Sequence, residues 1–290
     1  MDAQRAEIGI IGGTGLYDMP GLAGVEDVEC STPFGAPSSS IRLGTVAGRR
    51  VAFLARHGRH HTLLPSEVPY RANLYALRSL GVRDVLAVSA VGSLREDLPP
   101  RTAVVPDQAI DLTRRRALSF FGDGVVAHVA HGDPYDATLR DALLEGARAV
   151  GLPVVDGGTL VTMEGPQFST RAESRMYRTL GGDLIGMTGA TEARLAREAE
   201  LAYATLCFVT DYDAWREHEA TVETPQIVAI LRESAAASAR AVADAVARVP
   251  RTARPAHRAL AEALLTPVEA IPLATRARIS ALLAPYLPPG

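Results

Sequence analysis

The chain has 290 residues, of which 47% are hydrophobic and 22% charged, and its formal net charge is −3. This composition is typical of a globular protein with a core of its own. The slightly acidic balance, without a stripe of basic and aromatic residues, argues against nucleic-acid binding. Two cysteines, Cys30 and Cys207, do not make a disulfide framework. No apolar stretch reaches the roughly 20 residues of a membrane helix and no signal sequence is evident, so we expect a cytoplasmic protein that binds no membrane.

Short apolar runs alternate with helical patterns along the chain. Strands are predicted at the runs 8–11, 41–46, 50–55, 84–90, 102–105, 160–162, 183–187 and 201–209. Helices are predicted between and after them, at 68–80, 136–150, 170–180, 191–199 and 225–248. Because most of these strands are apolar on both faces, the alternation indicates one α/β domain with a central mixed, mostly parallel sheet flanked by helices.

The composition changes near residue 249. The segment 249–258 is rich in proline and arginine and resembles a linker. After it, 256–265 and 274–286 have the pattern of two short amphipathic helices. We therefore predict a main domain over 1–250 and a C-terminal helical appendage over 251–290.

The most informative segment is the end of the last apolar run. The run 201–209 stops at two carboxylates one residue apart, Asp211 and Asp213. In α/β proteins, ligands bind at the carboxyl ends of such strands. Two acids there suit a ligand with a basic ring nitrogen and an amino group, such as adenine. The alternative is that they only cap a following helix.

A glycine-rich turn, G-G-T-G-L at 12–16, follows the first predicted strand. Its backbone N–H groups and the hydroxyl of Thr14 suit an anion. The G-x-G-x-x-G spacing fails and no helix pattern follows, which argues against a nucleotide-dependent oxidoreductase. An ordinary tight turn is the alternative.

A second anion-binding candidate, A-R-H-G-R-H-H at 55–61, also follows a strand. Arg56 offers a planar fork for phosphate, and His57 a further donor. A zinc site formed by His57, His60 and His61 is disfavoured, because no acid or cysteine is near them in the sequence. A solvated basic loop is the remaining alternative.

Three further segments follow predicted strands or precede helices. Small residues at 89–95 allow backbone amides to face a ligand, and Phe168 in a Gly/Pro-rich loop could stack on a planar base. In G-M-T-G at 186–189, Thr188 suits an anion and Met187 a sugar. Each of these segments alone is equally compatible with a turn or with core packing.

Taken in order, these segments resemble the methylthioadenosine phosphorylase branch of the trimeric purine nucleoside phosphorylases. The matching pieces span about residues 7–248 and are I-G-I-I-G-G-T-G-L, T-P-F-G-A-P-S, A-R-H-G-R-H-H, P-Y-R-A-N, A-V-G-S-L-R-E, T-M-E-G-P-Q-F-S-T-R-A-E-S, G-M-T and T-D-Y-D-A-W. The resemblance implies phosphate-dependent cleavage of 5′-methylthioadenosine to adenine and 5-methylthioribose 1-phosphate. It also implies a homotrimer in which phosphate is a co-substrate and neither cofactor nor metal is needed.

The resemblance assigns roles to single residues. Phosphate would be held by Thr14, Arg56, His57, Ser89, Ala90 and Thr188. Met187 would pack on the ribose and Phe168 beside the base, while Asp211 and Asp213 would contact N7 and the 6-amino group as catalytic groups. His128 would be lent by a neighbouring subunit to the 5′ end of the nucleoside.

The sequence departs from the family pattern at several places. Ser89 stands where threonine is usual, G-A-T-E follows Thr188 where V-P-E is common, and the region 122–132 is short. Thr224 stands where a small apolar residue faces the methylthio group. Other substrates therefore stay open: adenosine, 5′-halo-5′-deoxyadenosine, methylthioinosine or inosine. A nucleoside sensor on the same fold is a further alternative, although the phosphate ligands argue against it.

The two aspartates also suggest a mechanism. Cleavage leaves negative charge on the purine, and a protonated Asp211 would neutralise it. Such an acid needs burial or a like charge nearby, which Asp213 would supply. We expect both side chains on one side, because residues i and i+2 of an extended strand point the same way.

Overall fold

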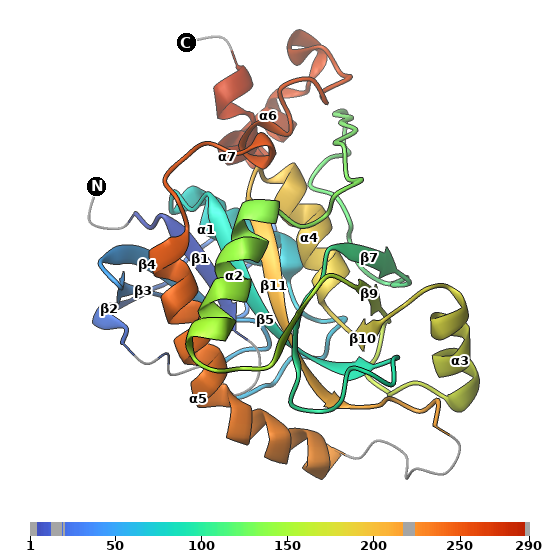
Figure 1. Cartoon of the computed structure of the whole chain (residues 1–290). Coiled ribbons are helices and arrows are strands. Elements are labelled where there is room, and N and C mark those ends of the chain that lie inside the picture. The colour runs from blue at the N-terminus through green and yellow to red at the C-terminus, as the bar shows by residue number, and fades with distance from the viewer. Residues whose placement is uncertain (1–4, 13–18, 20, 217–223, 288–290) are drawn as a thin grey trace.

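The computed structural model describes residues 5–12, 19, 21–216 and 224–287. They form one eleven-stranded sheet with helices on both faces (Figure 1). The strands are β1 Ile8–Gly12, β2 Ala23–Val28, β3 Ile41–Val46, β4 Arg49–Ala55, β5 Asp84–Ser93, β6 Ala103–Val105, β7 Gln108–Asp111, β8 Val154–Asp156, β9 Thr159–Thr162, β10 Leu184–Gly186 and β11 Ala202–Asp211. The predicted mixed, mostly parallel sheet is confirmed.

The sheet branches at β5. The main path runs β2-β3-β4-β1-β5-β10-β9-β7, while β11 pairs with β5 and β6, and β6 with β8. The first half of β5 is parallel to β1, from Asp84 to Ala87, whereas its end is antiparallel to β10 at Gly92 and Ser93. Between these stretches β5 has neither β1 nor β10 as a partner on that side.

The prediction missed three strands. Strand β2 has mostly exposed side chains and reads A-G-V-E-D-V, while β7 and β8 are short and end in an aspartate. None of them has the apolar run on which the prediction depended.

Seven α-helices are present in the described residues, and most were predicted. They are α1 Tyr70–Ser79, α2 Ala137–Ala149, α3 Arg171–Thr179, α4 Gly189–Glu198, α5 Thr224–Arg248, α6 Leu273–Arg278 and α7 Ser280–Leu283. Asp136 caps α2 by accepting from the N–H of Leu139, and Thr170 and Glu173 form a capping box at the start of α3. In the described part of the chain, no helix is long and apolar enough to span a membrane.

The two faces of the sheet have separate apolar cores. Side chains alternate along a strand, so Ile8 and Ile10 of β1 belong to one core and Ile11 to the other. Helices α2 and α5 cover the first face, side by side in Figure 1. They approach so closely that a Cβ on Gly146 would lie 2.3 Å from the carbonyl oxygen of Ala241. Helices α1 and α4 cover the other face.

The C-terminal segment packs into this second core. Leu260, Ile279 and Leu282 are fully buried in the same cluster as Leu74 and Leu77 of α1. The two predicted amphipathic helices are wrong in extent, because the segment consists of short 3₁₀ turns and the helices α6 and α7. The segment lies at the top of the molecule in Figure 1, above α1 and α4.

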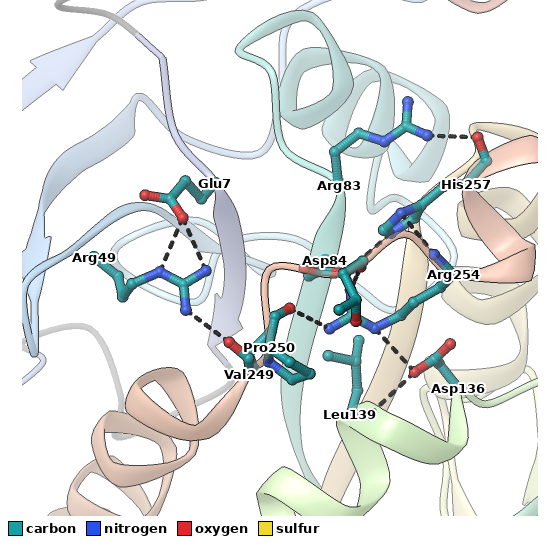
Figure 2. A network of polar contacts seen from close by, with 11 residues as sticks. Glu7, Arg49, Arg83, Asp84, Asp136, Leu139, Val249, Pro250, Arg254 and His257 are labelled. Carbon is teal, nitrogen blue, oxygen red and sulfur yellow. Dashed lines mark hydrogen bonds and ion pairs between the residues drawn. The ribbon is translucent and has the colours of Figure 1, made fainter.

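The predicted linker over 249–258 is also wrong, because it contains a buried ion-pair network (Figure 2). Arg254 donates to Asp84 at 2.8 Å and to the carbonyl of Pro250 at 2.9 Å, and it lies 3.4 Å from Asp136. His257 contacts the same Asp84 oxygen at 3.1 Å. The arginine that suggested a solvated linker is thus an anchor at the start of β5.

Arg254→Met should lower the free energy of unfolding by about 3–5 kcal/mol, because it leaves the buried Asp84 and Asp136 without their guanidinium. Urea denaturation measures this. The matched control is Arg251→Met, whose side chain is 69% exposed beside Glu7, and we expect it to cost less than about 1 kcal/mol. Equal losses in both variants would contradict the anchoring role of Arg254.

Candidate active site

A cavity of about 560 Å³ opens where β5 leaves β1 and joins β10. It lies beyond the ends of β4, β10 and β11, where ligands bind in branched α/β sheets. The predicted site residues that line it are Arg56, His57, Ser89, Ala90, Phe168, Met187, Thr188, Asp211 and Asp213. Thr14 lies outside the described residues. His128 is exposed and does not line the cavity of its own chain.

Arg56 forms the floor of one end of the cavity. The side chain of Glu192 on α4 accepts from its Nε at 2.5 Å and from its Nη2 at 2.9 Å, and the carbonyl of Val88 accepts from Nη1 at 2.9 Å. The hydroxyl of Tyr203 donates to Glu192 at 2.6 Å. Burial opposes the charge of Arg56, but Glu192 outweighs it and raises the pKa of the guanidinium. A guanidinium has five N–H donors, so one hydrogen on each terminal nitrogen stays available for a ligand.

Small polar groups surround the same end. Thr188 is the N-cap residue of α4, yet its side chain makes no capping hydrogen bond. Ser89 is 7% exposed, and its Oγ has no hydrogen-bond partner among the described residues. Buried hydroxyls are normally satisfied, and a helix N-terminus favours negative charge. This end of the cavity therefore suits an oxyanion.

His57 lies beside Arg56 and is held by its own loop. Its Nδ1 donates to the carbonyl oxygen of Leu63 at 2.9 Å, and its ring stacks on His61 with centroids 4.4 Å apart. Burial, followed by the charge of Arg56, lowers the pKa of His57 to about 4. The ring is therefore neutral near pH 7, and its single N–H is already engaged in the hydrogen bond to Leu63. The expectation that His57 donates to an anion does not fit this geometry.

Asp211 and Asp213 line the cavity beside Gly92, further along β5 than Val88, whose carbonyl binds Arg56. A β-bulge between Val209 and Asp211 shifts the register of β11. Asp213 lies beyond the strand with φ +51°. The expected i, i+2 geometry of an extended strand is therefore wrong, and a bulge and a tight turn bring both acids to the cavity instead.

Hydrogen bonds fix the orientation of Asp211. Its Oδ1 accepts from the backbone N–H of Asp213 at 2.8 Å, and its Oδ2 accepts from the hydroxyl of Thr210 at 2.6 Å. Gly92 makes room for it, since a Cβ there would lie 2.9 Å from that Oδ1.

Burial controls the ionisation of both acids. It is the largest cause that raises the pKa of Asp211, and the charge of Asp213 raises it slightly further. Burial also raises the pKa of Asp213, against the nearby hydroxyls of Ser174 and Ser169. The Oδ2 atom of Asp213 has no hydrogen-bond partner among the described residues. The expected like-charge effect is thus real but secondary to desolvation.

Apolar side chains connect the two ends. Met187, Ile185 and Pro166 line the middle of the cavity, and Leu64 and Phe168 are partly exposed at 45% and 42%. Because Phe168 lines the cavity and is partly exposed, its ring can contact a planar ligand.

Sequence reasoning missed Glu192, Tyr203 and Thr210. Thr210 lines the cavity, whereas Glu192 binds Arg56 and Tyr203 binds Glu192 behind it. The signal that could have indicated Glu192 is its place in the segment G-A-T-E, one helical turn after Thr188. The zinc alternative finds no support, because no group of three or more His, Cys, Asp or Glu side chains with metal-site geometry is present in the part of the chain that the structure describes.

Comparison with known proteins agrees with this fold. Residues 7–248 match the model of the phosphorylase superfamily. The chain therefore belongs to the phosphorylase superfamily.

Individual relatives are similar along nearly the whole chain. The S-methyl-5′-thioadenosine phosphorylase of Chloroflexus aurantiacus is 52% identical over 97% of this chain and 98% of its own length. A solved methylthioadenosine phosphorylase from an Antarctic soil metagenomic library is 48% identical, with a TM-score of 0.92 over 98% of this chain and 100% of that chain. The Schistosoma mansoni methylthioadenosine phosphorylase, solved with adenine, is 36% identical with a TM-score of 0.80 over 84% of this chain and 91% of that chain.

The lowered pKa of His57 gives a testable pH dependence. Between its unfolded pKa of 6.5 and its folded pKa of about 4, the unfolded chain holds a proton that the folded chain lacks. Its contribution to stability is complete above pH 6.5 and is lost as the pH falls towards 4. In His57→Gln, the loss of unfolding free energy as the pH falls through this range should therefore be smaller than in the unmutated protein, by up to about 3 kcal/mol.

Denaturant titrations across this pH range measure the effect. Other titrating groups are common to both proteins, so they cancel in the difference. His60→Gln changes an exposed neighbour and is the matched control. An H57Q curve parallel to that of the unmutated protein would show that His57 is not buried in its neutral form.

Proposed function

We propose that this protein cleaves 5′-methylthioadenosine with inorganic phosphate, giving adenine and 5-methylthioribose 1-phosphate. The observation that supports this most directly is that one cavity is lined by Arg56, Ser89 and Thr188 and also, further along β5, by Asp211 and Asp213. The relatives that are about half identical along nearly the whole chain are named for this activity.

The chemistry follows from the order of groups along the cavity. Phosphate at the Arg56 end lies on the side of the sugar from which an oxygen can attack C1′. As the new O–C1′ bond forms, the N9–C1′ bond breaks and its electron pair passes to the purine. Asp211, whose raised pKa favours the protonated form, gives its proton to N7 and becomes a carboxylate. Holding the reactants in this order removes much of the entropic barrier.

The same acids favour a 6-aminopurine. The charged form of Asp213 accepts a hydrogen bond from the 6-amino group but repels a 6-oxo group. A mispaired buried polar group costs roughly 1–3 kcal/mol. We therefore propose adenine nucleosides over hypoxanthine nucleosides, by about 10-fold or more.

The 5′ end involves Leu64 and Val228 on the cavity wall. Apolar contacts favour a methylthio group over a hydroxyl only weakly, by about 1–3 kcal/mol. Adenosine is therefore the second candidate substrate, and a Schistosoma mansoni relative that is 36% identical is described as an adenosine/methylthioadenosine phosphorylase. We further propose a homotrimer in which the exposed His128 completes the 5′ end of a neighbouring site. The reaction as proposed needs no metal or organic cofactor.

Product analysis with and without phosphate tests the function. Methylthioadenosine, adenosine and inosine are each incubated with the protein, and free base and sugar phosphate are followed by chromatography. We expect phosphate-dependent adenine release, fastest from methylthioadenosine. Adenine release that ignores phosphate would indicate a hydrolase, and preferred release of hypoxanthine would refute the role given to the two acids.

Asp211→Asn should lower kcat on adenine nucleosides by about 10²–10⁴-fold, since it removes the proton donor. Asp97→Asn is the matched control, because the side chain of Asp97 is 65% exposed and pairs with Arg95 outside the cavity. Steady-state kinetics, with circular dichroism to check folding, measure both variants. A folded D211N enzyme with unchanged turnover would remove Asp211 from the mechanism.

A further inference from the structure

The position of the proton on His57 is fixed by the structure. The partner of Nδ1 is the carbonyl oxygen of Leu63, at 2.9 Å, and a carbonyl cannot donate. Nδ1 must therefore be the protonated nitrogen. The backbone N–H groups of Thr62 and Leu63 both donate to the carbonyl of His57, at 3.0 and 3.3 Å, and the ring of His61 stacks on the His57 ring.

The other ring nitrogen, Nε2, is left as an acceptor. His57 lines the oxyanion end of the cavity, and none of the described residues forms a hydrogen bond with Nε2. The charged or titratable neighbours of the ring are Arg56, His61 and Arg116, and each of them disfavours a second proton. Among the described residues, no carboxylate is one of the main influences on the pKa of this ring. A ligand at this end thus meets a lone pair at His57.

The net charge at this end is small. Arg56 is the buried cation there, and Glu192, which is 3% exposed, neutralises it through two hydrogen bonds. Ser89 and Thr188 contribute hydroxyls, which donate or accept. The oxyanion end therefore recognises a ligand through hydrogen bonds more than through charge. Because Nε2 of His57 is an acceptor, the ligand must bring a hydrogen-bond donor to it.

We propose that His57 accepts a hydrogen bond from a P–OH group, so that the site selects oxyanions that carry a proton. This rests on the proposed function, which places phosphate at the Arg56 end. Hydrogen phosphate and hydrogen arsenate each carry a hydroxyl near neutral pH. Sulfate has the same shape and charge but no proton, so one of its oxygens would face the lone pair of Nε2 in a buried site.

The same contact orients the nucleophile. With its hydroxyl oxygen directed to His57, phosphate presents its unprotonated oxygens to Arg56, to Thr188 and Ser89, and to C1′. The proton stays on phosphate throughout, so the attacking oxygen is never the protonated one. His57 is thus a specificity and orienting residue for the phosphate.

Anion binding measured without nucleoside tests the proposal. Isothermal titration or thermal shift gives the affinities of phosphate, arsenate, sulfate and monofluorophosphate near neutral pH, the last being a phosphate analogue without a hydroxyl proton. We expect arsenate to bind like phosphate, and sulfate and fluorophosphate to bind at least about 10-fold more weakly, as expected for a mispaired buried group. The inhibition constant of sulfate against phosphate in the cleavage assay should show the same gap.

Two variants locate the cause. In His57→Gln the side-chain amide can turn an N–H towards the anion, so the gap between phosphate and sulfate should shrink to within about 3-fold, mainly through tighter sulfate binding. His60→Gln, which does not line the cavity, should keep the gap.

The outcomes separate this proposal from the function on which it rests. Equal binding of sulfate and phosphate by the unmutated enzyme, or a gap that persists in H57Q, would overturn the role of His57 while leaving phosphorolysis intact. A protein that neither binds phosphate nor needs it for base release would overturn the proposed function, and this inference with it.

Discussion

The change of partners along β5 is the constraint on which the site depends. A strand that is parallel to β1 at one end and antiparallel to β10 at the other cannot pair with either in between. The sheet therefore opens beside Ser89 and Ala90, and the backbone there faces a cavity instead of a neighbouring strand. Because β11 stays paired with β5 along this region, the opening is rigid. The loops after β4, β10 and β11 only have to supply side chains to it.

Helix α4 connects this opening to the rest of the molecule. Its first turns provide Glu192 for Arg56 and the hydroxyl of Thr191, which accepts from Arg116 at 2.9 Å. Near its end, Glu198 binds the backbone N–H of Phe120 at 2.8 Å. Just after the helix, Glu200 accepts from the N–H of Leu260 in the C-terminal segment. One helix thus fixes the oxyanion end, the segment leading to His128 and the C-terminal segment, so a shift of any one is resisted by the other two.

The sequence predicts those features whose signals lie close together along the chain. Apolar runs and caps are local, so the main strands and the helices that begin after Asp136 and Thr170 were predicted correctly. The burial of Arg254 was not predictable, because its partner Asp84 is 170 residues away. The geometry of Asp213 depends on a bulge and a positive φ, which alternation cannot show. Similarly, the tautomer of His57 is set by a hydrogen bond to a backbone carbonyl. Because every residue type has a backbone carbonyl, the sequence carries no signal for this contact.

The two ends of β5 show how a binding site differs from a structural anchor. Both carry buried charge. At Asp84 the carboxylate accepts from Arg254 and contacts His257, so this network stabilises the fold, and only Nε of Arg254 among these groups has no hydrogen-bond partner in the described residues. At the other end the hydroxyl of Ser89 and one oxygen of Asp213 are buried without hydrogen-bond partners among the described residues, and Arg56 keeps donors that none of the described residues uses. Unsatisfied buried groups destabilise the free protein by about 1–3 kcal/mol each, and a ligand that satisfies them recovers that energy on binding. Because Arg56, Ser89 and Asp213 line the cavity, this free energy is available to bind and orient an oxyanion and a base.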